Sequence, residues 1–132
     1  MIDIENELYT RIAKRLRNEF DPIDISGEFV KKPAQFPHVT IIQKDNSTYK
    51  PSMTHEEVHS LVMFEVNVYS NKITGKKSEC KKIMKTINEE FMDMGFERLV
   101  SRPIQNLEDA TIYRMVARYV GVINKEKIVF RR

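Results

Sequence analysis

The pattern His55-Glu56-Glu57-Val58-His59 matches the H-E-x-x-H signature of many zinc metalloproteases. In such enzymes two imidazoles one helical turn apart bind the ion, and the glutamate activates the zinc-bound water. Glu79, farther along the chain, lies about where one class of these enzymes has its third ligand. The chemistry at issue is peptide hydrolysis, and it requires a helix to carry the pattern.

The residues around this pattern do not favour a helix. Pro51 precedes it, and an alternation of apolar and polar residues begins just after His59. On a strand, His55 and His59 would share a face but lie about 13 Å apart, too far for one zinc ion. We therefore expect a polar turn that leads into a strand, and no metal site.

Two other motifs also have structural explanations. The sequence GKKS at 75–78 is similar to the end of a phosphate-binding loop, but Ser70 stands where such a loop has its first glycine, and Lys77 where it has Ser or Thr. A turn and a helix cap explain it, and no cofactor is expected. Cys80 falls on an apolar helical stripe, so we expect a core residue and no catalytic nucleophile.

Apolar periodicity predicts the elements that would position these residues. Helices are expected at 3–18 and 75–94, the second with Thr74 as N-cap and Gly95 at its C-terminal end. Strands are expected at 24–30, 38–44, 61–70, 109–123 and 127–132, with turns at 45–47 and 124–126. The order α-β-β-β-α-β-β predicts an α+β fold with two helices packed on a mostly antiparallel sheet.

Composition indicates one domain spanning 1–132. The chain has 132 residues, a net charge of +3, one cysteine and no linker-like or repeated segment. With no apolar run long enough to cross a membrane and no signal segment at its start, the chain is expected in the cytosol, without a disulfide. The small net charge does not by itself favour nucleic acid.

Charge is arranged unevenly around the predicted helix at 75–94. One flank is expected to carry Lys77, Lys81, Lys82 and Lys85, and the other to carry Glu79 and Glu90. An ordinary solvated helix would explain this. Alternatively, the basic flank of one subunit contacts an acidic flank of the next in a head-to-tail ring. Nucleic-acid binding ranks below the ring, because no aromatic residues are interleaved with the lysines.

Two predicted strands carry large apolar residues on both faces. Met63 lies opposite the face of Val62 and Phe64, and Tyr113, Met115 and Tyr119 share one face of the strand at 109–123. These residues make the face more apolar than that of a sheet exposed to solvent. They are expected either under a helix or against a partner.

The stretch LVMFEVNVYSNKITGKKSECKKIMKTINEEFMDMGFERL, followed by PIQNLEDATIYRMVARYVGVI, resembles the tail terminators among the neck and tail-completion proteins of tailed bacteriophages and prophages. The resemblance runs over most of the chain and rests on the order, length and phrasing of its segments. It implies an α+β subunit without an active site, which closes into a hexameric ring on the head-proximal end of the tail tube.

The resemblance also implies partners and a location. They are further copies of the chain, the tail tube protein, the head connector and, in a contractile tail, the sheath. Assembly would take place in the host cytoplasm and leave the protein in the virion. A head-completion or stopper protein on the connector side is the alternative within this class, and a small nucleic-acid-binding protein is the alternative outside it. The segments 45–60 and 97–109 are expected to be long connections that reach neighbouring rings.

Overall fold

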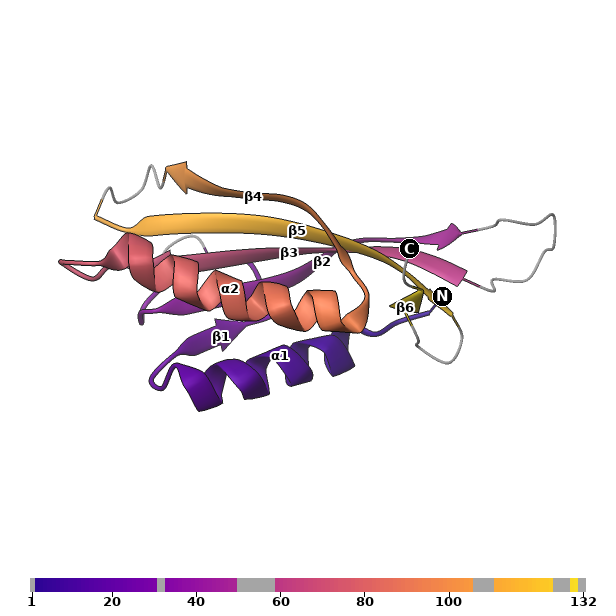
Figure 1. Ribbon diagram of the computed structural model, residues 1–132, viewed down its shortest axis with the longest axis horizontal. Helices are drawn as coiled ribbons and strands as arrows, with labels where there is room; N and C mark the ends of the chain where they lie inside the picture. Colours follow the sequence, from indigo (N-terminus) through magenta and orange to yellow (C-terminus); the bar gives the residue numbers. More distant parts are fainter. Residues whose placement is uncertain (1, 31–32, 50–58, 106–110, 125–128, 131–132) are drawn as a thin grey trace.

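A six-stranded sheet covered on one side by two helices forms the fold (Figure 1). The computed structural model describes residues 2–30, 33–49, 59–105, 111–124 and 129–130. Its elements are α1 (Glu5–Glu19), β1 (Asp24–Ser26), β2 (His38–Tyr49), β3 (His59–Ser70), α2 (Lys76–Met94), β4 (Glu97–Gln105), β5 (Tyr113–Asn124) and β6 (Val129–Phe130).

The strands are arranged in the order β1-β2-β3-β5-β4, and β6 pairs with β5. Only the pair of β1 and β2 is parallel, and all other pairs are antiparallel. The predicted α+β class, with two helices on a mostly antiparallel sheet, is therefore confirmed. The chain has one further strand, β4, where a connection was expected.

The hydrophobic core lies between the helices and one face of the sheet. Alternate residues of β3 point to this face because side chains alternate along a strand, and Val62, Phe64, Val66 and Val68 are all fully buried. The helices contribute Leu8, Ile12 and Leu16 from α1 and Cys80, Ile83, Ile87 and Phe91 from α2. The predicted faces of β3 are therefore confirmed.

An aromatic cluster closes the core where α2 turns into β4. Phe91 stacks on Tyr119 with ring centroids 4.0 Å apart and meets Phe96 edge-on at 5.2 Å. Phe64 adds a further edge-to-face contact with Phe96 at 5.9 Å. Pairs of this geometry add about 0.5–1.5 kcal/mol each beyond the apolar area that they bury. Tyr119, predicted to lie under a helix or against a partner, lies under α2.

Two glycines delimit α2. Gly95 has a φ of 95° and follows the helix as predicted, with its N–H bonded to the carbonyl oxygen of Met92 at 3.0 Å. The predicted N-cap was wrong. Gly75, with a φ of 87°, precedes the first helical residue in place of Thr74, and no side chain caps this end. A left-handed conformation favours glycine here over threonine.

Several predicted boundaries were wrong. The expected turn at 45–47 belongs to β2, which passes a bulge between Gln43 and Asp45 and continues to Tyr49. The segment 97–109, expected as a connection, forms β4 up to Gln105. The strand expected at 24–30 ends at Ser26.

Some predictions fall outside the described residues. These include most of the H-E-x-x-H pattern, from His55 to Val58; its last residue, His59, begins β3. The middle of the 45–60 segment, the end of the 97–109 segment and most of the expected turn at 124–126 also lie outside. Of the strand expected at 127–132, the described part is β6.

Gly121 is required by a close approach inside the aromatic cluster. A Cβ atom at this position would lie 2.9 Å from Cδ2 and 3.0 Å from Cε2 of Phe96, which is 3% exposed. Gly121→Ala is therefore expected to lower the free energy of unfolding by about 1–3 kcal/mol, measured by urea denaturation. In Gly27→Ala, the control, the new Cβ has its nearest neighbours at 3.9 Å. An equal loss in both variants would contradict the steric explanation.

Candidate interaction surfaces

The four lysines predicted as an interface lie exposed on α2, but not all on one flank. Lys77, Lys81 and Lys85 follow one another at helical-turn spacing on the side of α2 that faces away from α1. Lys82 lies one turn before Thr86, whose hydroxyl donates a hydrogen bond to Glu19 of α1. Lys82 is therefore on the α1 side. Within the described part of the chain, none of the four forms an ion pair.

The two acidic residues of the predicted interface already have partners within the chain. Glu79 accepts a hydrogen bond from the Ser70 hydroxyl at 2.7 Å and lies 3.5 Å from the Lys72 ammonium. Glu90 pairs with Arg11 at 2.7 Å and with Arg15 at 3.2 Å. The predicted contact between subunits stays a prediction, but its acidic side would have to come from other residues.

Charged pairs join the two helices. Arg15 donates hydrogen bonds to Glu89 at 2.8 Å and to Glu90, and Arg11 bonds to Glu90 and Asp93. Burial lowers the pKa of Arg11, but its two carboxylate partners outweigh this effect and raise the pKa. The hydrogen bond to Glu89 is the largest influence on Arg15, whose pKa is also raised. Cations on one helix and carboxylates on the next therefore fix how α1 packs against α2.

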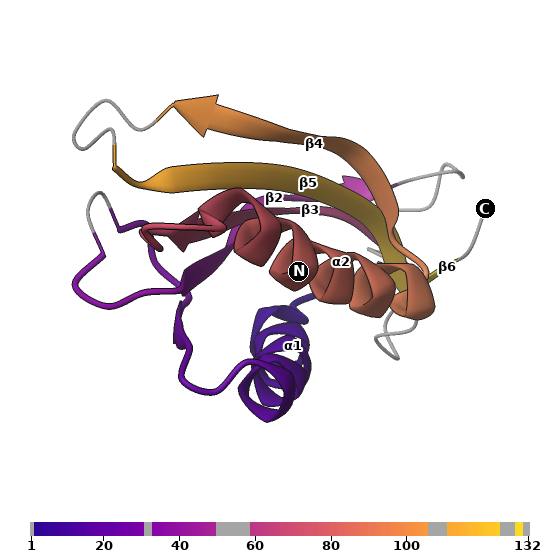
Figure 2. The ribbon, with the colours of Figure 1, turned by 60° about the vertical axis from the view of Figure 1, so that its left-hand side comes forward.

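The second surface is the sheet face opposite the helices, called here the outer face. Register places alternate residues of four strands on it. They are His38, Thr40 and Ile42 of β2, Met63, Glu65, Asn67 and Tyr69 of β3, Arg114, Val116, Arg118 and Val120 of β5, and Val100, Arg102 and Ile104 of β4. No helix covers this face within the described ranges (Figures 1 and 2).

A polar network occupies the centre of the outer face. Glu65 is 7% exposed and accepts hydrogen bonds from Arg118, with the Arg118 Nη2 atom 3.0 Å from Glu65 Oε1. The Lys44 ammonium lies 3.7 Å from the other carboxylate oxygen. Asn67 accepts a hydrogen bond from Arg114 at 2.9 Å and donates a long one to Glu65. The network buries a carboxylate beneath cations without a helix above it.

An aromatic stack borders the network at one end. The Arg114 guanidinium lies 5.5 Å from the Tyr69 ring centre and 5.9 Å from that of Phe29, which is 58% exposed. The Tyr69 hydroxyl donates a hydrogen bond to the carbonyl oxygen of Val30, and burial raises the pKa of this tyrosine. The residues after β1 therefore cross this end of the outer face, and among its described residues Met63, Val100, Ile104 and Val120 are only partly buried.

His38 is the one buried histidine among the described residues, and its role is structural. It is 2% exposed, and its Nδ1 atom lies 2.8 Å from a carboxylate oxygen of Asp24. Its Nε2 atom is enclosed, so the imidazole is not presented to a substrate from solvent. The contact fixes the parallel pairing of β1 with β2, in which Asp24 is aligned with His38.

Cys80 is a core residue, as predicted. It is fully buried, and its sulfur lies 3.7 Å from the carbonyl oxygens of Val68 and Tyr113. Burial, followed by the nearby Glu79 carboxylate, raises the pKa of the thiol to about 12. A nucleophilic cysteine needs the opposite shift, so the geometry does not support covalent chemistry here.

The thiol of Cys80 is therefore expected to react very slowly with a disulfide reagent in the folded protein at pH 8. Raising its pKa to about 12 leaves roughly a thousandfold fewer thiolates than an exposed cysteine has, and burial blocks access. Labelling should become rapid in denaturant. Because the folded-state pKa is raised, this group stabilises the fold below pH 9 and the contribution is lost as the pH rises towards 12. Rapid stoichiometric labelling of the native protein would contradict this assignment.

Sequence patterns did not reveal the Glu65 network. The alternation of β3 and β5 correctly put Glu65 and Arg118 on the faces away from the core. Their pairing depends on the register, which aligns Glu65 with Arg118 across the two strands. One available signal was a charged residue within an otherwise apolar strand, because such residues are rarely buried unless they are paired.

The described residues contain no group of three or more metal-binding side chains. Among the helices of the described ranges, none has the length and apolar character that a membrane span requires. In comparisons with known proteins, no family model matches the chain, and no curated protein matches it significantly in sequence.

Proposed function

We propose that the chain is a structural subunit that works by binding other proteins, and specifically that it is the terminator of a phage tail. In this role a hexameric ring of subunits caps the head-proximal end of the tail tube and joins the tail to the head connector. The proposal combines the resemblance of residues 61–99 and 103–123 to tail terminators with the surfaces of the folded chain.

The outer face is the observation that carries the proposal. Between its arginines it presents aliphatic side chains on three adjacent strands, with Met63 aligned with Val120 and with Val100 and Ile104 on the neighbouring edge strand. All four are only partly buried within the chain. Apolar side chains mixed with arginine are typical of protein interfaces, where lysine and acidic residues are depleted. We assign the contacts between ring subunits to this face.

The edges of the sheet favour a closed ring rather than an open fibre. The edge strand β4 contains Pro103, which lacks a donor for a neighbouring strand, and a bulge between Arg98 and Val100. The opposite edge is the short strand β1, and beyond it β2 is interrupted by its bulge next to the charged Lys44. Such features oppose uncontrolled edge-to-edge pairing. Contacts through a sheet face, in contrast, can close into a ring when the rotation between copies permits.

Termination of a tube has a simple physical requirement. A tube grows because each ring exposes the edge on which the next ring docks, so the terminator must match that edge on one side and fail to recreate it on the other. The paired strands β2 and β3 extend past the helices at the end opposite the α1 C-terminus (Figure 1). This extension provides an asymmetric feature that contacts one neighbouring ring only.

The direct test is to locate the protein in particles of the phage or prophage that encodes it. Purified particles should contain the chain in the proportion of one ring per tail, measured by quantitative mass spectrometry against the portal protein. In a lysate lacking the chain, tails should exceed their normal length or remain unattached to heads. Tails of normal length, attached to heads, in the absence of the chain would overturn the proposal.

A further inference from the structure

The helical layer of the fold is incomplete. The helix α1 lies on the β1 side, where the Tyr9 hydroxyl bonds to the Ile25 carbonyl oxygen, and α2 crosses β3 and β5. No described helix covers β4, as Figure 2 shows. Packed helices lie about 8–10 Å apart, and neighbouring strands about 4.8 Å apart. One further helix would therefore fit beside α2, above β4 and the near part of β5.

The surface at this position, called here the open strip, is apolar at one end, and Ser101 and Arg98 of β4 face the same side farther along. Tyr113 and Met115 of β5 face the helical side and are only partly buried at the margin of the core. Pro103 of β4 is aligned with Met115 and is exposed. On α2, Met92 is 41% exposed at the C-terminal end of the helix, away from Tyr113 and Met115. Tyr113 and Met115, predicted to lie under a helix or against a partner, thus lie beside α2 but incompletely covered.

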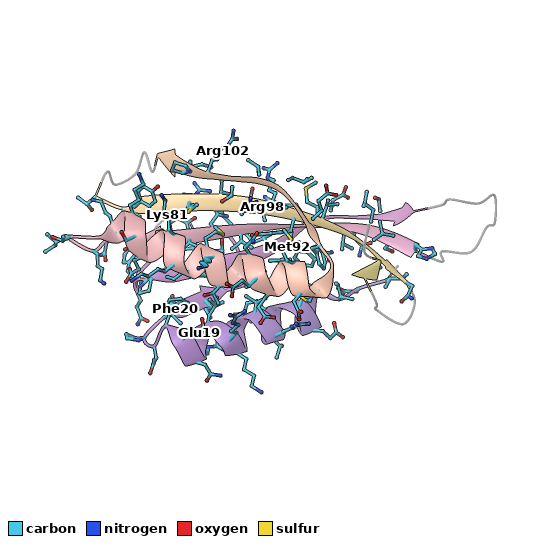
Figure 3. The ribbon with its side chains drawn as sticks, in the orientation of Figure 1. Glu19, Phe20, Lys81, Met92, Arg98 and Arg102 are labelled. Atoms are coloured by element: carbon cyan, nitrogen blue, oxygen red, sulfur yellow. The ribbon has the colours of Figure 1, made fainter. Side chains whose placement is uncertain are left out.

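The wall of the open strip is positively charged. Lys77, Lys81 and Lys85 line the flank of α2 on this side, and Arg98 of β4 lies near Tyr119, whose hydroxyl bonds to Asn88 of α2. Figure 3 labels Lys81 on the side of α2 towards β4, and Glu19, the last residue of α1, on the opposite side of α2. None of the four cations forms an ion pair with a described carboxylate. Among the described residues, this run of cations along the open strip is therefore not neutralised.

The opposite flank of α2 indicates what such a surface binds. There α1 packs with its apolar stripe on the core, while Arg11 and Arg15 pair with Glu89, Glu90 and Asp93 of α2. On the open strip the charges of α2 are reversed: this flank of the helix carries cations instead of carboxylates. Charge complementarity then requires carboxylates on the incoming helix.

We propose that the open strip binds an amphipathic, acidic α-helix of another protein. Apolar residues of that helix, spaced at i, i+3, i+4 and i+7, would contact Tyr113 and Met115, and its flanking carboxylates would pair with Lys81 and Lys85. The inference goes beyond the proposed ring and does not require it. A second copy of this chain is a poor source of the helix, because both of its described helices bury their apolar stripes in their own core.

The test uses a synthetic helical peptide with leucine at i, i+3, i+4 and i+7 and glutamate on the adjoining flank. Titrated into the isotopically labelled full chain, it should shift the backbone amide signals of Lys81, Lys85 and Met115 in a saturable manner, and leave those of the outer face unchanged. A matched peptide with glutamine in place of glutamate should bind more weakly. Absence of binding, or shifts confined to another surface, would overturn the proposal.

Charge-reversal variants provide the matched comparison. The double variant Lys81→Glu/Lys85→Glu is expected to bind the acidic peptide roughly tenfold or more weakly than the unchanged chain does. Lys14→Glu/Arg17→Glu, which reverses two exposed cations of α1, should leave the affinity unchanged. Thermal unfolding of both variants controls for loss of the fold. Equal affinities of the two variants would overturn the proposal.

Two other results would also overturn it. The first is a preference of the strip for duplex DNA over the peptide, with the affinity falling steeply with salt. The second is a concentration-dependent shift of the same signals without peptide, which would indicate a second copy of the chain. Particle incorporation is read out separately, so a failed titration leaves the terminator proposal standing, and absence from particles leaves the helix-binding proposal standing.

Discussion

Replacing Phe91 by alanine is expected to lower the free energy of unfolding by about 3–5 kcal/mol, the usual range for a fully buried phenylalanine. Phe91 is inaccessible to solvent and contacts the rings of Tyr119, Phe96 and Phe64. The variant removes a stacked pair and an edge-to-face pair together, and leaves a cavity where α2, β3, β4 and β5 meet. Domains are typically stable by only 5–15 kcal/mol, so this one change should remove much of the margin.

The free energy of unfolding is measured by urea denaturation at neutral pH, with circular dichroism as the signal. Met92→Ala is the matched control, because Met92 is the next residue of the same helix but is 41% exposed. Its loss of stability should stay below about 1 kcal/mol. Similar losses in the two variants would contradict the position of the aromatic cluster at the centre of the core.

The second large effect is expected on assembly. Val120→Lys should abolish incorporation of the chain into particles while the subunit stays folded. Val120 lies on the outer face, aligned with Met63 on one side and with Glu97 of β4 on the other. A lysine here faces an acidic residue across the strands, an arrangement that sheets tolerate. It nevertheless places a charge in the apolar part of the proposed contact, where burying an unpaired charge is costly.

Incorporation is measured by complementing a deletion of the gene and counting infectious particles. Thr10→Lys, on the exposed side of α1, introduces the same charge away from the outer face and should complement fully. Unfolding curves of the purified variants separate loss of contact from loss of the fold. Full complementation by a folded Val120→Lys protein would contradict the role assigned to the outer face.

The two-residue period made the central strands predictable from sequence. Val62, Phe64, Val66 and Val68 alternate with more polar residues, and only a strand brings them to one face. The same reasoning correctly separated Tyr113, Met115 and Tyr119 from Arg114 and Arg118 on β5. The stripe of α2 was equally clear, because Cys80, Ile87 and Phe91 recur at helical spacing. In each of these elements the large aliphatic and aromatic residues of one face lie in the core, so their patterns carry strong signals.

The strand β4 could not be predicted in this way. Its sequence, ERLVSRPIQ, has arginine at 98 and 102, a proline at 103 and a bulge beside Leu99, which breaks the alternation. It is an edge strand with little burial on either face, so its pairing with β5 determines its structure and its own periodicity does not. The turn expected at 45–47 was wrong for a related reason. Asp45, Asn46 and Ser47 are typical turn residues, but the long partner strand β3 holds them in the sheet.

The candidate surfaces were predictable only in part. Helical projection located Lys77, Lys81 and Lys85 on one flank of α2, because that depends on the helix alone, but it wrongly placed Lys82 with them. It could not show that Glu90 is paired with Arg11 and Arg15, because the packing of α1 against α2 is a tertiary contact between segments far apart in sequence. The sequence therefore predicted that Glu79 and Glu90 face a neighbouring subunit, but it did not reveal that both have partners within the chain.

The outer face and the open strip lie on opposite sides of the sheet, so one subunit can use them at the same time. Subunits contacting through the outer face would leave the lysines of α2 accessible on the helical side. Lys81 and Lys85, which pair with no described carboxylate, would then be available to another component of the particle. A head-to-tail ring needs a second contact surface on each subunit besides the outer face, and if that surface lies away from α2 the open strip stays free to bind a different protein.

Electron cryomicroscopy of intact particles would show where the protein lies. We expect a hexameric ring of this fold between the last ring of the tail tube and the head connector, with the outer face of each sheet buried against a neighbouring subunit. Density against the portal would support a stopper protein instead. Absence of the fold from the particle, or its presence with the outer faces open to solvent, would contradict the account.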